Sequence, residues 1–267
     1  NNILQQMVRQ MNDIVTSLAK SMDIKEYIKI NDEHTREDIE QIFLAVAGTN
    51  NQIMQLRFID KNGMEIVRVD RKNEESQPFI VEKGKLQDKS DRDYFQIVSQ
   101  MKEPKLWHSK IDLNIENGKI EVPYRPTFRV AMPIFEEGNF EGMVILNILT
   151  NNLIRAIQTS SAFKHYIIDK DGYFILHPDP YFSHNRYTGT HRNLTDDFPM
   201  DALSILEGAK KGGDFFAYSL DSVLGNDDNA ILVLQPKDEY KNFLIKEKIK
   251  SSIIVVTLSV LLSILLA

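Results

Sequence analysis

Apolar residues at the start of the chain recur every three or four positions, which is the spacing of one face of an α-helix. Polar residues fill the positions between them, so the rest of this helix is expected to be solvated. A polar break at Asn31 and Asp32 follows, and a second helix is predicted from about Thr35 to Ala47, ended by Gly48. The stripe of the first helix consists of Ile3, Met7, Met11, Ile14, Leu18 and Met22.

The pattern then changes to alternating apolar and polar residues, which is typical of β-strands. Residues 55–60 and 64–70 are predicted strands, and Lys61-Asn62-Gly63 is a tight turn between them. Residues 166–176 repeat this order of strand, turn and strand with a closely similar turn sequence. Two copies of one α+β unit explain the repetition better than one irregular domain.

The first copy contains an insertion between its first hairpin and its later strands. A helix is predicted from Asp91 to Met101, and a loop from Lys102 to Arg125 carries the only tryptophan, Trp107. Long ordered insertions are commonly functional, so a site is expected in the first copy. Thr150 to Phe163 is predicted to form a helix that links the copies. The later predicted strands are 128–134 and 142–147 in the first copy and 215–218 and 230–234 in the second.

The last residues, Ser251 to Ala267, carry no charge and no proline, and they are apolar around most of the helical circumference. Because such a surface suits lipid, a transmembrane helix is predicted, although the number of residues is near the lower limit for crossing a bilayer. A buried core helix is the alternative. Lys246, Lys248 and Lys250 precede this run and by themselves favour placing the domain on the cytoplasmic side. The chain begins in mid-helix, and the sequence leaves open whether a first membrane span precedes Asn1.

The composition argues against several classes of protein. The net charge of −6, with basic and acidic residues interspersed, gives no support to nucleic-acid binding. The absence of cysteine excludes disulfides, thiol catalysis and zinc–thiolate sites. The sequence has no nucleophile elbow, phosphate-binding glycine loop or zinc-protease motif. No catalytic residue and no cofactor is therefore predicted.

The second copy carries three histidines spaced by seven residues, His177, His184 and His191. Metal ligands on one element are usually two to four residues apart, so a metal site is not favoured. Asp169 to Gly172 resembles the opening of a calcium loop, but the required acceptor series and terminal glutamate are missing, and a hairpin turn is favoured. Two alternative functions remain open: a membrane-tethered metal-dependent enzyme and a partner-binding domain without a small ligand.

The chain contains six informative strings: FIDKNGMEIVRVDR (58–71), LQDKSDRDYF (86–95), KIDLNIENGKIEVPYRPTFRVAMPIF (110–135), FEGMVILNI (140–148), DGYFILHPDP (171–180) and RNLTDDFP (192–199). With the order of elements, they resemble the double Cache domain, the tandem PAS-like extracytoplasmic module of prokaryotic histidine kinases, chemoreceptors and cyclic-dinucleotide enzymes. The resemblance covers nearly the whole chain and is greatest to the histidine-kinase branch.

The resemblance implies an α+β fold with antiparallel sheets in two tandem PAS-like domains. The implied parts are a long membrane-emergent helix (1–30), a membrane-distal ligand-binding domain (31–150), a linking helix (151–164), a membrane-proximal domain (165–243) and a juxtamembrane and transmembrane helix (244–267).

The resemblance also implies a role. It implies a homodimer formed mainly along the N-terminal helix, in the inner membrane, with this region extracytoplasmic (periplasmic). On this point the resemblance outweighs the orientation favoured by the three lysines. It implies no enzymatic activity for this segment and transmission through the membrane to a histidine kinase, with a chemoreceptor or diguanylate cyclase as alternative outputs.

One branch of this family binds amino acids through an R-x-W-Y string on a pocket helix and an aspartate late in the last strand of the distal domain. The matching string here is Arg92-Asp93-Tyr94-Phe95, and the strand position matches Asn147. The arginine is present, but the carboxylate that would pair with a ligand ammonium is replaced by an amide. The expected ligand is therefore an organic acid held by the arginine rather than an α-amino acid.

The residues expected to form the site each have a structural alternative. Arg129 is a charged residue in an apolar predicted strand, so it is expected either to face the pocket or to pair with a buried carboxylate such as Asp112. Arg92 alternatively pairs with Asp88 or Asp91, and the aromatic residues alternatively belong to the core. The predicted ligand-binding residues are Arg92, Tyr94, Phe95, Trp107, Arg129 and Asn147.

Overall fold

The computed structural model describes residues 2–116, 118–150, 154, 160–228 and 230–266. The chain divides into two compact units, Asn1–Ile157 with Leu220–Ala230, and Gln158–Ser219 with Ile231–Ala267. The segment Leu220–Ala230 belongs to the first unit. In the sequence it falls between two strands of the second unit, inside the range expected for the second domain. The predicted linking helix falls largely on residues outside the described ranges.

Three helices precede the first sheet. They are α1 (Asn2–Ala19), α2 (Met22–Ile30) and α3 (Glu33–Thr49). The predicted long N-terminal helix is α1, and the segment up to residue 30 continues as a separate helix because Ser21 caps the N-terminus of α2 by accepting a hydrogen bond from the Ile24 amide. The buried face of α1 is rotated slightly from the predicted stripe and consists of Leu4, Val8, Met11, Val15 and Leu18.

The first unit is built on an antiparallel sheet in the order β3-β2-β1-β9-β8-β4, with β5 paired to β8. A separate hairpin is formed by β6 and β7. The remaining elements of this unit are the short helices η1 (Lys83–Lys85), α4 (Asp93–Ser99) and α9 (Asp221–Leu224). The strands are β1 (Ile53–Asp60), β2 (Glu65–Asp70), β3 (Phe79–Ile80), β4 (Trp107–His108), β5 (Asp112–Leu113), β6 (Ile115–Glu116), β7 (Lys119–Ile120), β8 (Pro126–Glu136) and β9 (Asn139–Leu149).

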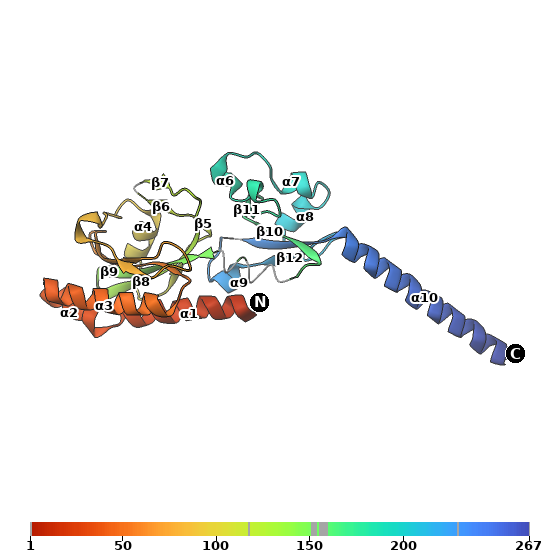
Figure 1. The fold of residues 1–267 in the computed structure, drawn as a ribbon, viewed down its shortest axis with the longest axis horizontal. Coiled ribbons are helices and arrows are strands. Elements are labelled where there is room, and N and C mark those ends of the chain that lie inside the picture. Colours follow the sequence, from red (N-terminus) through yellow and green to blue (C-terminus); the bar gives the residue numbers. More distant parts are fainter. Residues whose placement is uncertain (1, 117, 151–153, 155–159, 229, 267) are drawn as a thin grey trace. The chain divides into compact units, whose positions relative to one another are not determined.

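The two faces of this sheet have different covers. Alternate residues of a strand point to opposite faces, so Phe58 and Phe128 lie on the face that contacts α1, α2 and α3. The other face carries an apolar cluster in which Ile59 and Ile145 pack against Tyr94 of α4. In Figure 1 these three N-terminal helices lie on one side of the sheet and α4 on the other. The α4 face is therefore the one on which the insertion is folded.

The second unit has a smaller antiparallel sheet in the order β11-β10-β13-β12. Its core joins one face of this sheet to the short helices α7 and α8, through Tyr166, Phe174, Phe198 and Ile205. Its elements are β10 (Phe163–Ile168), β11 (Phe174–Leu176), η2 (Pro180–Phe182), α6 (Asn185–Thr188), α7 (Leu194–Asp197), α8 (Ala202–Leu206), β12 (Phe216–Ser219), β13 (Ile231–Pro236) and α10 (Asp238–Leu266).

The repeated turn has the same hydrogen bonds in both units. The Asp60 carboxylate accepts hydrogen bonds from the amides of Asn62 and Met64 at 2.9 and 2.8 Å. The Asp169 carboxylate accepts them from Asp171 and Tyr173 at 2.9 and 3.0 Å. An aspartate that bonds its own backbone two residues on stabilises such a turn. The predicted duplication of an α+β unit is thus visible in the atomic detail of the turn.

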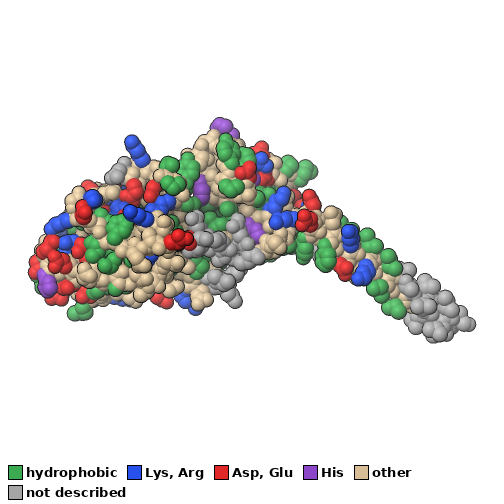
Figure 2. All heavy atoms as spheres, in the orientation of Figure 1, with side chains coloured by type: hydrophobic (Ala, Val, Ile, Leu, Met, Phe, Trp, Pro, Cys, Tyr) green, Lys and Arg blue, Asp and Glu red, His purple; other side chains and the backbone are tan. Residues whose placement is uncertain are grey.

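The last described element is the helix α10, which includes residues 251–266 of the predicted transmembrane run. Within the ranges that the structure describes, no helix combines the length and the apolar character needed to cross a membrane. Figure 2 shows hydrophobic side chains beside charged ones on the first part of α10. Phe243, Ile245 and Ile249 are exposed there.

Burial of His184 predicts a pH dependence of stability. His184 lies at the N-terminus of α6 with a φ of 56° and is 9% exposed, and burial lowers its pKa from 6.5 to about 4. The unfolded chain takes up this proton first as the pH falls, so the free energy of unfolding should decrease from about pH 6.5 to pH 4.

His184→Asn should make this decrease shallower, because asparagine tolerates the positive φ and does not titrate. Chemical denaturation at several pH values measures the slope. His34→Asn on α3 provides the control, because the side chain of His34 is 83% exposed. Equal slopes for wild type and His184→Asn would contradict the prediction.

Candidate functional site

Charged and polar side chains are buried on the α4 face of the first sheet. Gln55 and Arg57 lie on β1 at the two alternate positions before Ile59, so they share its face. In the sheet register, Gln55 lies opposite Asp70 of β2 and Asn147 of β9, and Arg57 lies opposite Arg68. With residues from β2, β6, β9 and the loop before α4 they form what we call the polar cluster: Gln55, Arg57, Glu65, Arg68, Asp70, Gln87, Lys89, Glu116 and Asn147.

Arg57 is at the centre of the buried part of the polar cluster, with only 2% of its surface exposed. Its guanidinium donates hydrogen bonds to the Tyr94 hydroxyl at 3.2 Å and to Asn147 Oδ1 at 2.7 Å. Its Nη1 atom is 3.5 Å from Oε1 of Glu65, whose side chain is fully buried. A buried charge is tolerated when it is paired and hydrogen-bonded, so these contacts stabilise Arg57 in place.

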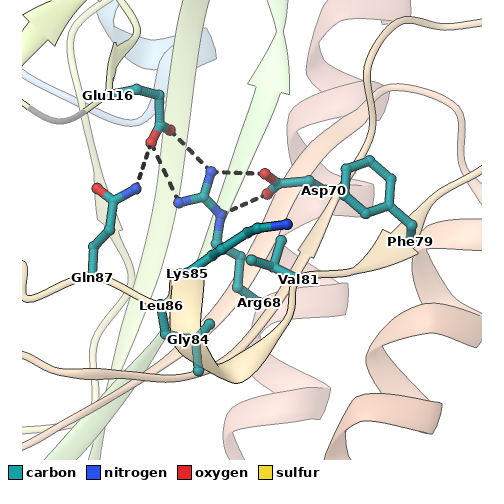
Figure 3. A pocket seen from close by; sticks show the side chains of 9 residues that line it. All are labelled: Arg68, Asp70, Phe79, Val81, Gly84, Lys85, Leu86, Gln87 and Glu116. Atoms are coloured by element: carbon teal, nitrogen blue, oxygen red, sulfur yellow. Dashed lines mark hydrogen bonds and ion pairs between the residues drawn. The ribbon is translucent and has the colours of Figure 1, made fainter.

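Arg68 donates hydrogen bonds to two further carboxylates, those of Asp70 and Glu116 (Figure 3). Its Nε and Nη2 atoms donate to the two oxygens of Asp70 at 2.8 and 2.7 Å, and Nη1 and Nη2 donate to Glu116 at 3.3 and 3.2 Å. Glu116 also accepts hydrogen bonds from Gln55 at 2.8 Å and Gln87 at 3.2 Å. Burial by itself raises the pKa of Glu116, but the charge of Arg68 and the Gln55 hydrogen bond lower it to about 2.

A cavity of about 550 Å³ opens beside Arg68. Figure 3 shows the guanidinium between Glu116 and Asp70, with Phe79 and Val81 on the side of Asp70 and with Lys85 and Leu86 on the segment in front. The cavity thus has a polar part around one arginine and an apolar wall. It is lined by Arg68, Asp70, Phe79, Val81, Gly84, Lys85, Leu86, Gln87 and Glu116.

The structure places the six predicted residues in four different settings on the first unit. Tyr94, Phe95 and Trp107 contribute to the apolar cluster on the α4 face, although the Tyr94 hydroxyl reaches the polar cluster. Arg92 is half-buried at the N-terminus of α4, with its guanidinium 5.7 Å from the centre of the Tyr94 ring. Asn147 holds Arg57 and donates to Gln55 at 2.8 Å.

Arg129 takes the second of the two arrangements expected for it. Its Nη1 atom is 2.5 Å from Oδ1 of Asp112, and the residue is 3% exposed. Arg129 lies opposite Asn147 in the sheet register, so it is on the α4 face. None of the six predicted residues is among the described residues that line the cavity beside Arg68.

Sequence reasoning missed Arg57, Arg68 and Glu116. The first two had the signal that was used for Arg129, a charged residue at an alternate position of an apolar strand. Glu116 had no such signal, because it lies in a polar insertion and only the fold brings it to Arg68. No three histidine, aspartate or glutamate side chains gather as metal ligands would, in the part of the chain that the structure describes.

His177 of the second unit contacts a carboxylate, a backbone amide and aromatic rings. His177 Nε2 is 2.6 Å from Oδ2 of Asp197, and His177 Nδ1 accepts a hydrogen bond from the Asp179 amide at 2.9 Å. Arg192 bonds the second oxygen of Asp197. Aromatic rings of Tyr166, Phe174 and Phe182 surround His177. His177 therefore serves the packing of this unit.

Two antiparallel sheets, a duplicated turn and a buried polar cluster next to a cavity define a PAS-like sensor module. The model of the bacterial histidine kinase sensor domain matches residues 3–207, and this chain belongs to that family. This family match confirms the expected Cache-type sensor domain. A comparison with curated proteins gave no match.

Solved structures share the fold over most of the chain. The extracellular domain vpHK1S-Z8, described as part of a histidine kinase, is 21% identical with a TM-score of 0.75, covering 90% of this chain and 86% of that one. A sensory box/GGDEF family domain from Vibrio parahaemolyticus is 20% identical with a TM-score of 0.75, covering 90% and 91%. The sensory domain of the Campylobacter jejuni chemoreceptor Tlp3 with isoleucine bound is 11% identical with a TM-score of 0.56, covering 90% and 91%. At these identities the likeness concerns the fold alone.

Proposed function

We propose that this chain is the extracytoplasmic sensing region of a membrane-bound receptor and that its first unit binds a small organic acid in the cavity beside Arg68. The observation that carries the proposal is a buried arginine, 5% exposed, at the wall of a cavity large enough for a small metabolite. A guanidinium presents paired donors that match a carboxylate. Phe79, Val81 and Leu86 would contact the apolar part of such a ligand.

Three of the residues predicted from the sequence, Arg92, Tyr94 and Asn147, fit this proposal as positioning residues rather than as ligand contacts. Tyr94 and Asn147 hold Arg57, and Arg57 faces Arg68 across the β1–β2 pair. Arg92, at the N-terminus of α4, has its guanidinium 5.7 Å from the centre of the same Tyr94 ring. The bound isoleucine of the Tlp3 sensory domain supports small-molecule binding by this fold, not the identity of the ligand.

The proposal includes an output beyond this segment. Ligand binding would shift the equilibrium between two arrangements of a homodimer held along α1, and the second unit with α10 would pass the change across the inner membrane. The family match supports a histidine kinase as the output module. The uncharged run 251–267 supports a membrane segment at the end of α10.

The test uses a simple aromatic acid and its neutral amide. We expect 3-phenylpropionate to bind the chain in calorimetric titration and 3-phenylpropionamide to bind more weakly. Arg68→Lys keeps the positive charge but not the paired donors, and a hydrogen bond to a charged group contributes about 1.5–3 kcal/mol, so affinity for the acid should fall about 10- to 100-fold.

The control is Arg186→Lys in the second unit, where Arg186 pairs with Asp169 and Asp171 and is not among the residues that line the cavity. This variant should bind the acid as the wild type does. Equal affinity of wild type and Arg68→Lys would refute the assignment of Arg68. Equal affinity for the acid and the amide would refute carboxylate recognition.

A further inference from the structure

The segment β6 is joined to the first sheet by the carboxylate of Glu116. In the sheet topology β6 pairs with β7, and these two strands form a sheet of their own. The Glu116 carboxylate receives hydrogen bonds from Gln55 on β1, Arg68 on β2 and Gln87 in the loop before α4. One side chain therefore connects β6 to three separate segments around the cavity.

The two carboxylates on Arg68 are not held equally. Asp70 lies on the same strand as Arg68 and accepts two hydrogen bonds at 2.7 and 2.8 Å. Glu116 accepts from Arg68 at 3.2 and 3.3 Å, and it comes from outside the sheet. Charge-assisted hydrogen bonds of about 2.7–2.9 Å are the strong ones, so Arg68 holds Glu116 less tightly than it holds Asp70.

The charge balance of the polar cluster favours displacement. Lys85 also lines the cavity, but it is exposed and pairs with Glu82 outside this cluster. The polar cluster contains three cations, Arg57, Arg68 and Lys89, and three carboxylates, Glu65, Asp70 and Glu116, in contact with one another. A ligand carboxylate added to this balanced group would place a fourth negative charge among largely buried side chains. Such a charge is costly without a partner of its own. Binding becomes favourable when one resident carboxylate leaves for solvent.

We propose that Glu116 occupies the carboxylate subsite of the empty receptor and that an organic acid binds by taking its place on Arg68, which frees β6 from the sheet. This inference rests on the proposed function and adds a regulatory step to it. A tethered carboxylate competes at a high effective concentration, so it lowers the apparent affinity for the free acid. Ligand binding is thereby coupled to the position of β6. A change in the position of β6 is one that the rest of the receptor can respond to.

The experiment compares wild type, Glu116→Gln and Glu121→Gln in titrations with 3-phenylpropionate. The amide of Glu116→Gln keeps the size of the side chain but loses the charge, so affinity for the acid should rise about tenfold as the competitor is weakened. Glu121 pairs with Arg125 and Asn114 and does not line the cavity, so Glu121→Gln should bind as the wild type does.

Hydrogen exchange gives a second readout. In the wild type, amide exchange in peptides spanning 114–121 should become faster when the acid binds. In Glu116→Gln it should already be fast without the acid and change little on binding. Equal or weaker affinity in Glu116→Gln, or slower exchange in these peptides on binding, would overturn the displacement of Glu116 while leaving the Arg68 site intact. Binding of the acid by none of the three proteins would overturn the displacement and the proposed function together.

Discussion

Replacing Arg57 with methionine should lower the free energy of unfolding of the first unit by about 3–5 kcal/mol, the range for removing one partner of a buried ion pair. The side chains of Arg57 and Glu65 are 3% and 0% exposed. Without the guanidinium, Glu65 keeps a buried charge with a weaker set of partners, and Asn147 and the Tyr94 hydroxyl lose a donor. The loss comes mainly from the groups left behind, because methionine itself fits a buried site.

Chemical denaturation followed by tryptophan fluorescence measures this effect. Trp107 is the only tryptophan and packs against the apolar cluster of the first unit, so its signal reports that unit. Arg92→Met is the matched control, because Arg92 contacts the same Tyr94 ring at 5.7 Å as against 5.6 Å for Arg57. It is half-buried, and its loss should cost less than about 1 kcal/mol. Similar losses in both variants would show that the ion pair with Glu65 is not the source of the effect.

Gly142→Ala should be the second strongly destabilising change, with an expected loss of about 2–4 kcal/mol from backbone strain and overpacking together. Gly142 lies on β9 with a φ of 151°, and a Cβ atom there would come within 2.4 Å of the carbonyl oxygen of Ile59 on β1. Gly142 pairs with Asp60 on one side and Ile134 on the other. A shift that relieves the clash would therefore disturb the hydrogen bonds of two central strand pairs.

The same fluorescence experiment tests this variant. Gly48→Ala in α3 is the control, because a Cβ atom at that position meets nothing within 4 Å. Alanine is favoured over glycine inside a helix by about 0.5–1 kcal/mol, so this variant should be as stable as the wild type or slightly more so. A Gly142→Ala protein that unfolds at the wild-type denaturant concentration would contradict the close approach of β9 to β1.

Much of the fold could be predicted because it depends on local patterns. The alternation at residues 55–60 and 64–70 became β1 and β2, and the two turns beginning at Asp60 and Asp169 have matching hydrogen bonds. The phase of α1 was predicted less well: Met11 and Leu18 are buried as expected, whereas Met7 is half-buried and Val8 is buried. Which residues of an amphipathic helix are buried most deeply depends on the surface that it packs against, which no local pattern contains.

For the candidate site, too, local patterns could be predicted and tertiary contacts could not. The sequence by itself determined that a charged residue in an apolar strand needs a partner, and for Arg129 it named the right one, Asp112, beside the alternative of a pocket role. It also determined the duplicated α+β unit and the family. Only the tertiary structure decided that Arg57 is held by Asn147, 90 residues away, and that Glu116 reaches Gln55 across 61 residues. The physical reason is that alternation assigns a side chain to a face of a sheet, whereas strand order and the path of the insertion decide which opposite charge lies within hydrogen-bonding distance on that face.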